Sequence, residues 1–182
     1  MKYLAFLLLL IPATAAASSK IVRNSMGGDI DVSSAPHGAT LRTMGGDIEV
    51  RSSSGIVVAK TMGGDIRVDR LAGSLDAGTM GGNVEVEVLG AGTDRTIRIK
   101  SMGGHVEVTL PKGFGAEFEV ELEQDDDEAH QIISDFPLNI TESKGRYWFK
   151  RTVVLKGTGR NGSGANRVRL SSVGGDITIR AR

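Results

Sequence analysis

The side chains that most often carry catalysis are scattered in this sequence. The three histidines, His37, His105 and His130, lie at unrelated positions, and the chain has no cysteine that could act as a nucleophile or hold a metal. The G-x-S-x-G motif of serine hydrolases and the H-E-x-x-H motif of zinc proteases are both absent. We therefore expect no catalytic residue of the nucleophilic or metal-dependent kind.

Acidic side chains could cleave glycosidic bonds, a reaction that needs a pair of carboxyl groups. Glu49, Glu85 and Glu107 are the candidates, because they recur at one position of a repeated sequence segment that is described below. That position is the polar phase of an alternating strand, so the same residues are expected on a solvated surface. We therefore expect the protein not to be an enzyme, with a carbohydrate-binding or carbohydrate-active β-helix protein as the alternative.

A glycine-rich segment, Gly157–Gly162, matches the dinucleotide fingerprint G-x-G-x-x-G and follows a predicted strand. In a dinucleotide site a helix begins at the end of this motif, and its N-terminus holds the pyrophosphate. Here residues 163–170 lead into another alternating segment, which predicts a strand. We interpret residues 157–164 as a flexible turn and expect no cofactor.

Two groups of oxygen-bearing side chains could bind cations. Calcium-binding β-rolls use a nine-residue pattern that differs from the acidic column found here, so we interpret that column as capping turns. Asp125–Glu128 is a better calcium candidate because it concentrates hard oxygen ligands, and calcium-dependent surface assembly stays a second alternative. We expect no metal site. The column contains Asp29, Asp47, Asp65, Asn83, His105 and Asp176.

The acidic column and the three glutamates belong to a short repeated sequence, S/T-M-G-G-D-I-x-V, here called the phrase. It occurs six times with small variations. The first four copies are spaced by 18 residues, the fifth follows after 22, and the sixth has valine in place of methionine. Repetition at a fixed period is typical of stacked structural units. The six copies are marked by Met26, Met44, Met62, Met80, Met102 and Val173.

Apolar and polar residues alternate on both sides of the glycine pair, which predicts two half-buried strands in each copy. Counted from the methionine, the apolar residues lie three and five residues before it but four and six residues after it. Because side chains of one straight strand alternate strictly, the chain must bend at the glycines, through positive φ or close backbone approach. The hydroxyl side chain before each methionine is expected to stack internally.

The sequence therefore predicts an all-β fold, a parallel β-solenoid or β-helix with coils of about 18 residues and two strands per coil. Methionine, isoleucine and valine ladders are expected to form a narrow apolar interior. Residues 18–182 are expected to form a single domain, with regular coils in 20–110, degenerate coils in 111–171 and a closing coil in 172–182.

The degenerate region keeps the alternation but loses the phrase. Glu117–Glu123 alternates glutamate with apolar residues, and 132–138 and 146–155 are predicted to be further strands. Trp148 and neighbouring aromatic residues predict a bulkier interior here. Residues 117–128 are strongly acidic and residues 144–182 mostly basic, so we expect oppositely charged strands to lie side by side.

Residues 1–17 have the features of a secretory signal peptide. Lys2 supplies the positive charge, Leu4–Ile11 the apolar segment and Ala13–Ala17 the small-residue cleavage region. The apolar segment is too short for a membrane-spanning helix, so we expect an exported chain, periplasmic or at the cell surface, without a transmembrane segment after Ser18. The 22 basic and 22 acidic residues balance, so no overall basic field favours nucleic acid.

The repeated strands, the Leu110–Ala116 step, Ile133–Leu138 and the closing Gly174–Ile179 copy together resemble a bacterial family of exported β-strand-repeat proteins that carries an adhesin label and has no assigned function. The resemblance spans nearly all of the chain after the signal peptide. It implies a solenoid in the periplasm or at the cell surface, and no functional residues. The sequence thus favours a non-enzymatic envelope or surface protein, adhesin-like or structural, with an unknown protein or glycan ligand.

Overall fold

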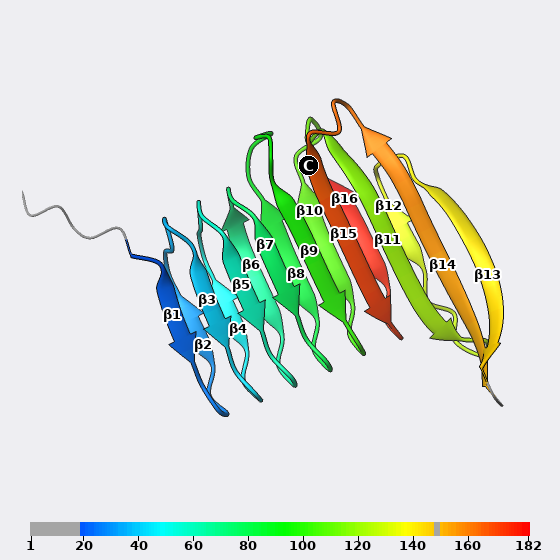
Figure 1. Cartoon of the computed structure of the whole chain (residues 1–182), viewed down its shortest axis with the longest axis horizontal. Helices are drawn as coiled ribbons and strands as arrows, with labels where there is room; N and C mark the ends of the chain where they lie inside the picture. The colour runs from blue at the N-terminus through cyan, green and yellow to red at the C-terminus, as the bar shows by residue number, and fades with distance from the viewer. Residues whose placement is uncertain (1–18, 148–149) are drawn as a thin grey trace, which may run out of the picture.

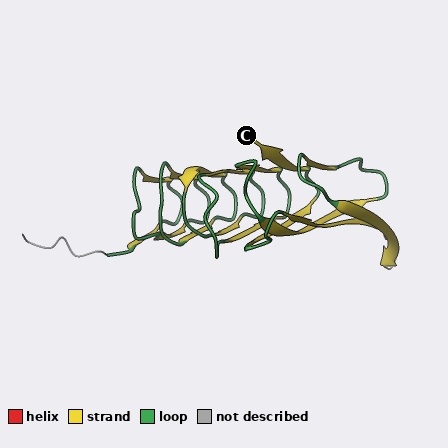
Figure 2. Cartoon of the chain, turned by 90° about the horizontal axis from the view of Figure 1, so that it is seen from above, coloured by secondary structure: helices red, strands yellow, loops and turns green. Residues whose placement is uncertain are grey.

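The strands form two sheets that face each other across one apolar core (Figures 1 and 2). The computed structural model describes residues 19–147 and 150–182. The nine-stranded sheet has the order β1-β3-β5-β7-β9-β15-β11-β14-β13, and the seven-stranded sheet has the order β12-β16-β10-β8-β6-β4-β2. The strands are β1 (Ile21–Asn24), β2 (Ile30–Val32), β3 (Ala39–Arg42), β4 (Ile48–Val50), β5 (Val57–Lys60), β6 (Ile66–Leu71), β7 (Leu75–Gly78), β8 (Val84–Val88), β9 (Thr96–Ser101), β10 (Val106–Leu110), β11 (Ala116–Asp125), β12 (Ile132–Ser134), β13 (Asn139–Tyr147), β14 (Lys150–Asn161), β15 (Asn166–Val173) and β16 (Ile177–Ala181).

The repeated phrase supplies one strand to each sheet, which confirms the predicted parallel solenoid with two strands per coil. β3 pairs in parallel with β5, and β4 pairs in parallel with β6, so that each residue meets its equivalent in the next coil. Ile48, for example, is paired with Ile66, and both are buried. Like residues therefore stack on like residues, and the isoleucine and valine ladders fill the interior as expected.

The methionines lie outside this interior, so the prediction of a methionine-lined core was wrong. Met62 and Met80 are each 50% exposed, and Met26 is 85% exposed. The reason is strand phase: the hydroxyl residue before Met44, Met62, Met80 and Met102 is buried, so the next side chain along the chain points outward. The methionine therefore follows the phase of the strand before the corner.

Each corner is held by the hydroxyl residue that precedes the methionine. Thr61 Oγ1 donates a hydrogen bond to the Gly46 carbonyl oxygen at 3.0 Å and accepts one from the Gly64 amide at 3.2 Å. The first bond joins two coils, and the second closes the turn of one coil. The equivalent residues Thr43, Thr79, Ser101 and Ser172 are also buried, which confirms the predicted internal stacking of this column.

The second glycine of each pair is required by close backbone approach. A Cβ atom added to Gly64 would overlap the Gly46 backbone of the preceding coil. Positive φ is found at only one glycine of these described corners, Gly174, with φ 71°. Of the two predicted reasons for the glycines, close approach is therefore the general one.

The last copy of the phrase does not close the array, so the expected closing coil at 172–182 was placed wrongly. β15 lies between β9 and β11, and β16 lies between β10 and β12 (Figure 1). Ser172 Oγ donates to the Gly104 carbonyl oxygen at 3.2 Å, as in the other corners. Because the degenerate segment lacks this corner, the last copy stacks on the β9–β10 coil and the degenerate segment stacks outside it.

The outer end of the nine-stranded sheet is antiparallel. β14 pairs antiparallel with β11 on one side and with β13 on the other. The predicted turn at 157–164 is strand as far as Asn161, because Gly157 and Gly159 leave room for Leu138 and Pro137 to pack against β14. These two glycines have no side chain, so the segment that contains Pro137 and Leu138 can lie close to β14.

Aromatic rings fill the core of the degenerate region. Phe114 and Phe118 are fully buried, and the Phe118 and Phe136 rings lie 5.2 Å apart between centroids. This agrees with the predicted bulkier interior. Trp148 and the predicted signal peptide at 1–17 lie outside the described residues. Within the described residues, no helix is both long enough and apolar enough to cross a membrane.

Candidate functional site

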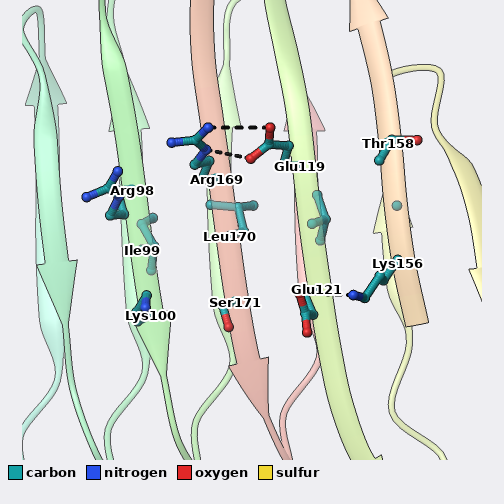
Figure 3. Close-up of a pocket in the computed structure, with 12 residues that line it drawn as sticks. Arg98, Ile99, Lys100, Glu119, Glu121, Lys156, Thr158, Arg169, Leu170 and Ser171 are labelled. Atoms are coloured by element: carbon teal, nitrogen blue, oxygen red, sulfur yellow. Dashed lines mark hydrogen bonds and ion pairs between the residues drawn. The ribbon is translucent and has the colours of Figure 1, made fainter. Parts of the chain in front are cut away.

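A shallow groove of about 480 Å³ crosses the outer face of the nine-stranded sheet over β9, β15, β11 and β14 (Figure 3). Sheet register explains the hollow. Ser171 is paired with Lys100 on one side and with Glu121 on the other, so a short side chain lies between two long ones. The inserted β15 strand therefore creates the groove, and no groove residue pair could be predicted from repeat spacing alone.

One wall of the groove is a bidentate ion pair between β15 and β11. Arg169 Nε and Nη2 donate to the Glu119 carboxylate at 2.5 and 3.5 Å (Figure 3). Hydrogen bonding to Arg169 lowers the pKa of Glu119, which favours the ionised form of this carboxylate. On the other wall, Lys156 Nζ lies 3.8 Å from Glu121. These pairs confirm the prediction that acidic and basic strands lie side by side.

The cations on the β9 side of the groove are not neutralised in this way. Arg98 and Lys100 point outward from β9, are exposed, and form no ion pair with any described residue. Asp76, which is paired with Arg98 in the sheet register, is already bound to Lys60 at 2.6 Å. The groove thus combines two neutralised walls with a free positive rim, an arrangement that can accept an anionic group.

The predicted acidic column forms a hydrogen-bonded ladder between coils. Asp47 Oδ1 accepts the backbone N–H of Asp65 at 2.7 Å, and Asp65 Oδ1 accepts that of Asn83 at 2.6 Å. The side chains therefore cap turns, as predicted, and the turn that each one caps belongs to the next coil. Because one oxygen of each aspartate already has this role, the column does not resemble a cation site.

Two of the scattered histidines meet at the inserted coil. His105 Nδ1 accepts the Asp176 backbone N–H at 3.0 Å, and His130 Nδ1 lies 3.4 Å from Asp176 Oδ1. The ring centroids are 6.4 Å apart. His37 is exposed and lies in the return loop before β3. Sequence spacing could not predict the His105–His130 contact, because it depends on where the last coil inserts.

The calcium candidate Asp125–Glu128 forms a tight turn rather than a cage of oxygens. The Glu128 amide donates to the Asp125 carbonyl oxygen at 3.1 Å, and the Asp126 carboxylate lies 3.7 Å from Arg151. Glu128 also lies 3.8 Å from His130. Among the residues that the structure describes, no cluster of three or more His, Cys, Asp or Glu side chains is arranged to hold a metal ion.

The three glutamates considered for sugar cleavage lie on the outer face of the seven-stranded sheet. Each is matched by an arginine: Glu49 by Arg51 at 3.1 Å, Glu85 by Arg67 at 2.7 Å, and Glu107 by Arg180 at 2.8 Å. They are spread along one sheet face, and no described groove contains them. Their arrangement is that of a charged, solvated surface. The Gly157–Gly162 segment, considered for a dinucleotide, is part of strand β14 as far as Asn161.

The comparisons with known proteins bear on the fold and leave the groove unassigned. A family model described as Toastrack DUF4097 matches residues 11–180, which is nearly the whole chain. Neither the search of curated proteins nor the search of solved structures found a match. The family match agrees with a β-repeat domain of unknown function and with the two-sheet solenoid described above. The chain therefore belongs to the Toastrack DUF4097 family.

Proposed function

We propose that the protein is a non-enzymatic, exported bacterial envelope protein that binds an anionic ligand, foremost an acidic glycan, in the groove over β9, β15, β11 and β14. The observation that carries the proposal is the positive rim formed by Arg98 and Lys100, which no described carboxylate neutralises. Uronate or phosphate groups of an envelope polymer suit such a rim. The rigid sheet holds the cations in fixed positions, so little ordering is needed when the ligand binds.

The composition of the groove supports binding rather than turnover. Glu119 and Glu121 are its described carboxylates, and both face cations of neighbouring strands. Ion pairing stabilises the charged form of a carboxylate, so the group is seldom protonated near neutral pH and has no proton to donate as a general acid. Glycoside cleavage needs one carboxyl group that is protonated, and the hydrogen bond from Arg169 lowers the pKa of Glu119, which disfavours that form.

Export is supported by the pattern of residues 1–17, with a charged start, a short apolar segment and small residues near Ala15. Expression in a bacterial host followed by N-terminal sequencing of the mature chain tests this part. We expect cleavage before Ser18. An intact Met1 in the periplasmic fraction, or a protein confined to the cytoplasm, would contradict it.

The binding experiment uses purified residues 18–182 on an array of acidic and neutral glycans. We expect binding to acidic glycans that weakens as salt is added, because surface charges are screened. The double variant Arg98→Ala/Lys100→Ala should lose at least about tenfold in affinity. The matched control, Arg51→Ala/Arg67→Ala, removes two cations from the opposite sheet and should bind normally. Equal loss in both variants, or binding to neutral glycans alone, would refute the assignment.

The alternatives are tested with the same material. Release of reducing ends that is abolished by changing one of Glu49, Glu85 or Glu107 would establish a carbohydrate-active enzyme. A melting temperature that rises with excess calcium, and no longer does so after Asp126→Asn, would establish calcium-dependent assembly. The proposed function predicts neither result.

A further inference from the structure

In the repeated phrase, the methionine side chain lies outside the buried core and forms no hydrogen bond with the described residues. The preceding hydroxyl residue, the second glycine, the column residue and the aliphatic pair each contact the neighbouring coil or the core, as described above. The methionine side chains point outward instead, with exposed fractions between 50% and 85%. An exposed position needs no particular residue for stability, so its repetition calls for another explanation.

A second exposed position, five residues after the methionine, shows how freely such sites vary. Five of the six copies keep methionine, whereas the outward position between the two core residues of the second strand changes charge and size from copy to copy. The residue type therefore varies freely in one exposed column, whereas the other changes only at Val173. The variable column contains Asp31, Glu49, Arg67, Glu85, Glu107 and Thr178.

The outward methionines form a continuous row, here called the methionine ridge: Met26, Met44, Met62, Met80 and Met102. The coils stack in register, and strands of neighbouring coils are about 4.8 Å apart. The first glycine of each corner leaves the ridge open on one side. A Cβ on Gly63 would find its nearest neighbours at 3.8 Å, and its φ is not positive, so packing does not demand glycine there.

The ridge presents thioether sulfurs, which are soft, uncharged ligands. In proteins such ligands select Cu(I) and similarly soft ions over Ca²⁺, Mg²⁺ or Zn²⁺. A metal–sulfur bond is about 2.3 Å long, so two of them span about 4.6 Å. This span matches the stacking distance of the coils, and the flexible methionine side chain can make the final adjustment. One ion therefore fits between thioethers of consecutive coils.

Charged side chains of both signs lie near the ridge. Asp47 and Asp65 lie on the same corners, three residues after Met44 and Met62. At the far end, Met102 and Glu128 line a hollow of about 520 Å³ together with Glu123 and Val173. Carboxylates thus lie at the centre and at one end of the ridge, and Lys100 lies two residues before Met102. The spacing of the thioethers therefore carries the argument for a metal ion, not the surrounding charge.

We propose that the methionine ridge binds soft monovalent metal ions, Cu(I) or Ag(I), between the thioethers of consecutive coils. The site is separate from the anion-binding groove, because it lies along the corners rather than on the sheet face. The metal-binding proposal is therefore independent of the proposed function, and each can be tested without the other.

Titration of purified residues 18–182 with Ag(I), followed by methyl NMR of the methionines and by metal analysis after desalting, tests the proposal. We expect the methyl resonances of Met44, Met62 and Met80 to shift and at least one ion to stay bound. The triple variant Met44→Leu/Met62→Leu/Met80→Leu keeps an apolar ridge but has no central sulfur, so its affinity should fall at least about tenfold. Cu(I) under anaerobic conditions should behave in the same way.

The controls separate thioethers from histidines and from apolar docking. His105→Ala/His130→Ala should bind Ag(I) normally, and wild-type binding should be similar at about pH 5 and about pH 7.5, where histidine titrates and thioethers do not. Val173→Met should extend the ridge and increase the number of bound ions. Unchanged Ag(I) binding by the triple leucine variant would overturn the proposal. If the triple variant does not fold, unchanged binding by the single Met62→Leu variant would overturn it equally.

Discussion

At the scale of single residues, the corner hydroxyl shows why the phrase is repeated so closely. The hydroxyl group donates a hydrogen bond to a carbonyl oxygen of the preceding coil and accepts one from an amide of its own coil. Thr79 forms these bonds with Gly64 and Gly82, at 3.0 Å each. Serine fulfils the same role at Ser101, and Ser172 forms the bond to the carbonyl of the neighbouring coil. Apolar side chains cannot form these bonds, so the buried position requires a hydroxyl residue. The methionine that follows it lies on the outside.

Replacing the hydroxyl of a central corner by a methyl group should destabilise the fold. Thr61→Val keeps the size of the side chain but leaves the Gly64 N–H and the Gly46 carbonyl without their partner in a buried place. We expect a loss of about 1–3 kcal/mol in the free energy of unfolding, measured by urea denaturation. Thr61→Ser retains the hydroxyl and is the control. Equal stability of the valine and serine variants would show that these bonds contribute nothing.

At the scale of the element, each coil is two strands joined by a corner, and the sequence predicts this much well. Alternation and the change of phase at Gly-Gly are local signals, so strands and corners follow from them directly. The side on which the methionine lies was mispredicted, because a corner residue can follow the phase of either flanking strand. The buried threonine before it was the signal that decides, since neighbouring side chains in one strand point to opposite faces.

The two glycines of one corner should differ in their tolerance of a side chain. Gly64→Ala would force a Cβ into the Gly46 backbone, whereas Gly63→Ala meets only ordinary contacts. We expect Gly64→Ala to lower the free energy of unfolding by about 1–3 kcal/mol or to prevent folding, because the neighbouring backbone cannot move aside. Gly63→Ala should change the melting temperature little. Similar effects of the two substitutions, seen in thermal denaturation by circular dichroism, would contradict the close-approach explanation.

At the scale of the whole molecule, the order of coils in space departs from the order in sequence. The last copy of the phrase inserts between the fifth copy and the degenerate segment. Local patterns could not predict this, because any phrase-bearing coil can stack on any other with the same register. The groove depends on this insertion: Arg98, Arg169 and Glu119 come from three strands that are adjacent only because β15 lies between β9 and β11.

The inserted coil should therefore be essential to one half of the molecule, unlike the last coil of a simple solenoid. In the described part of the sheets, β11 reaches the regular coils only through β15, and β12 pairs only with β16. A chain that ends at residue 165 lacks β15 and β16 and should lose hydrogen-exchange protection throughout β11, β13 and β14. Protection in β3–β8 should persist, because these strands keep their neighbours and stacked repeats are stabilised mainly by adjacent units.

The matched control removes a coil from the other end. A chain without residues 19–34 lacks β1 and β2, and it should lose protection only in the newly exposed edges β3 and β4. If β11, β13 and β14 stayed protected in the chain that ends at 165, the degenerate segment would be able to stack directly on the β9–β10 coil. The insertion would then be a consequence of chain order rather than a requirement of corner geometry, and the groove over β15 would lose its structural basis.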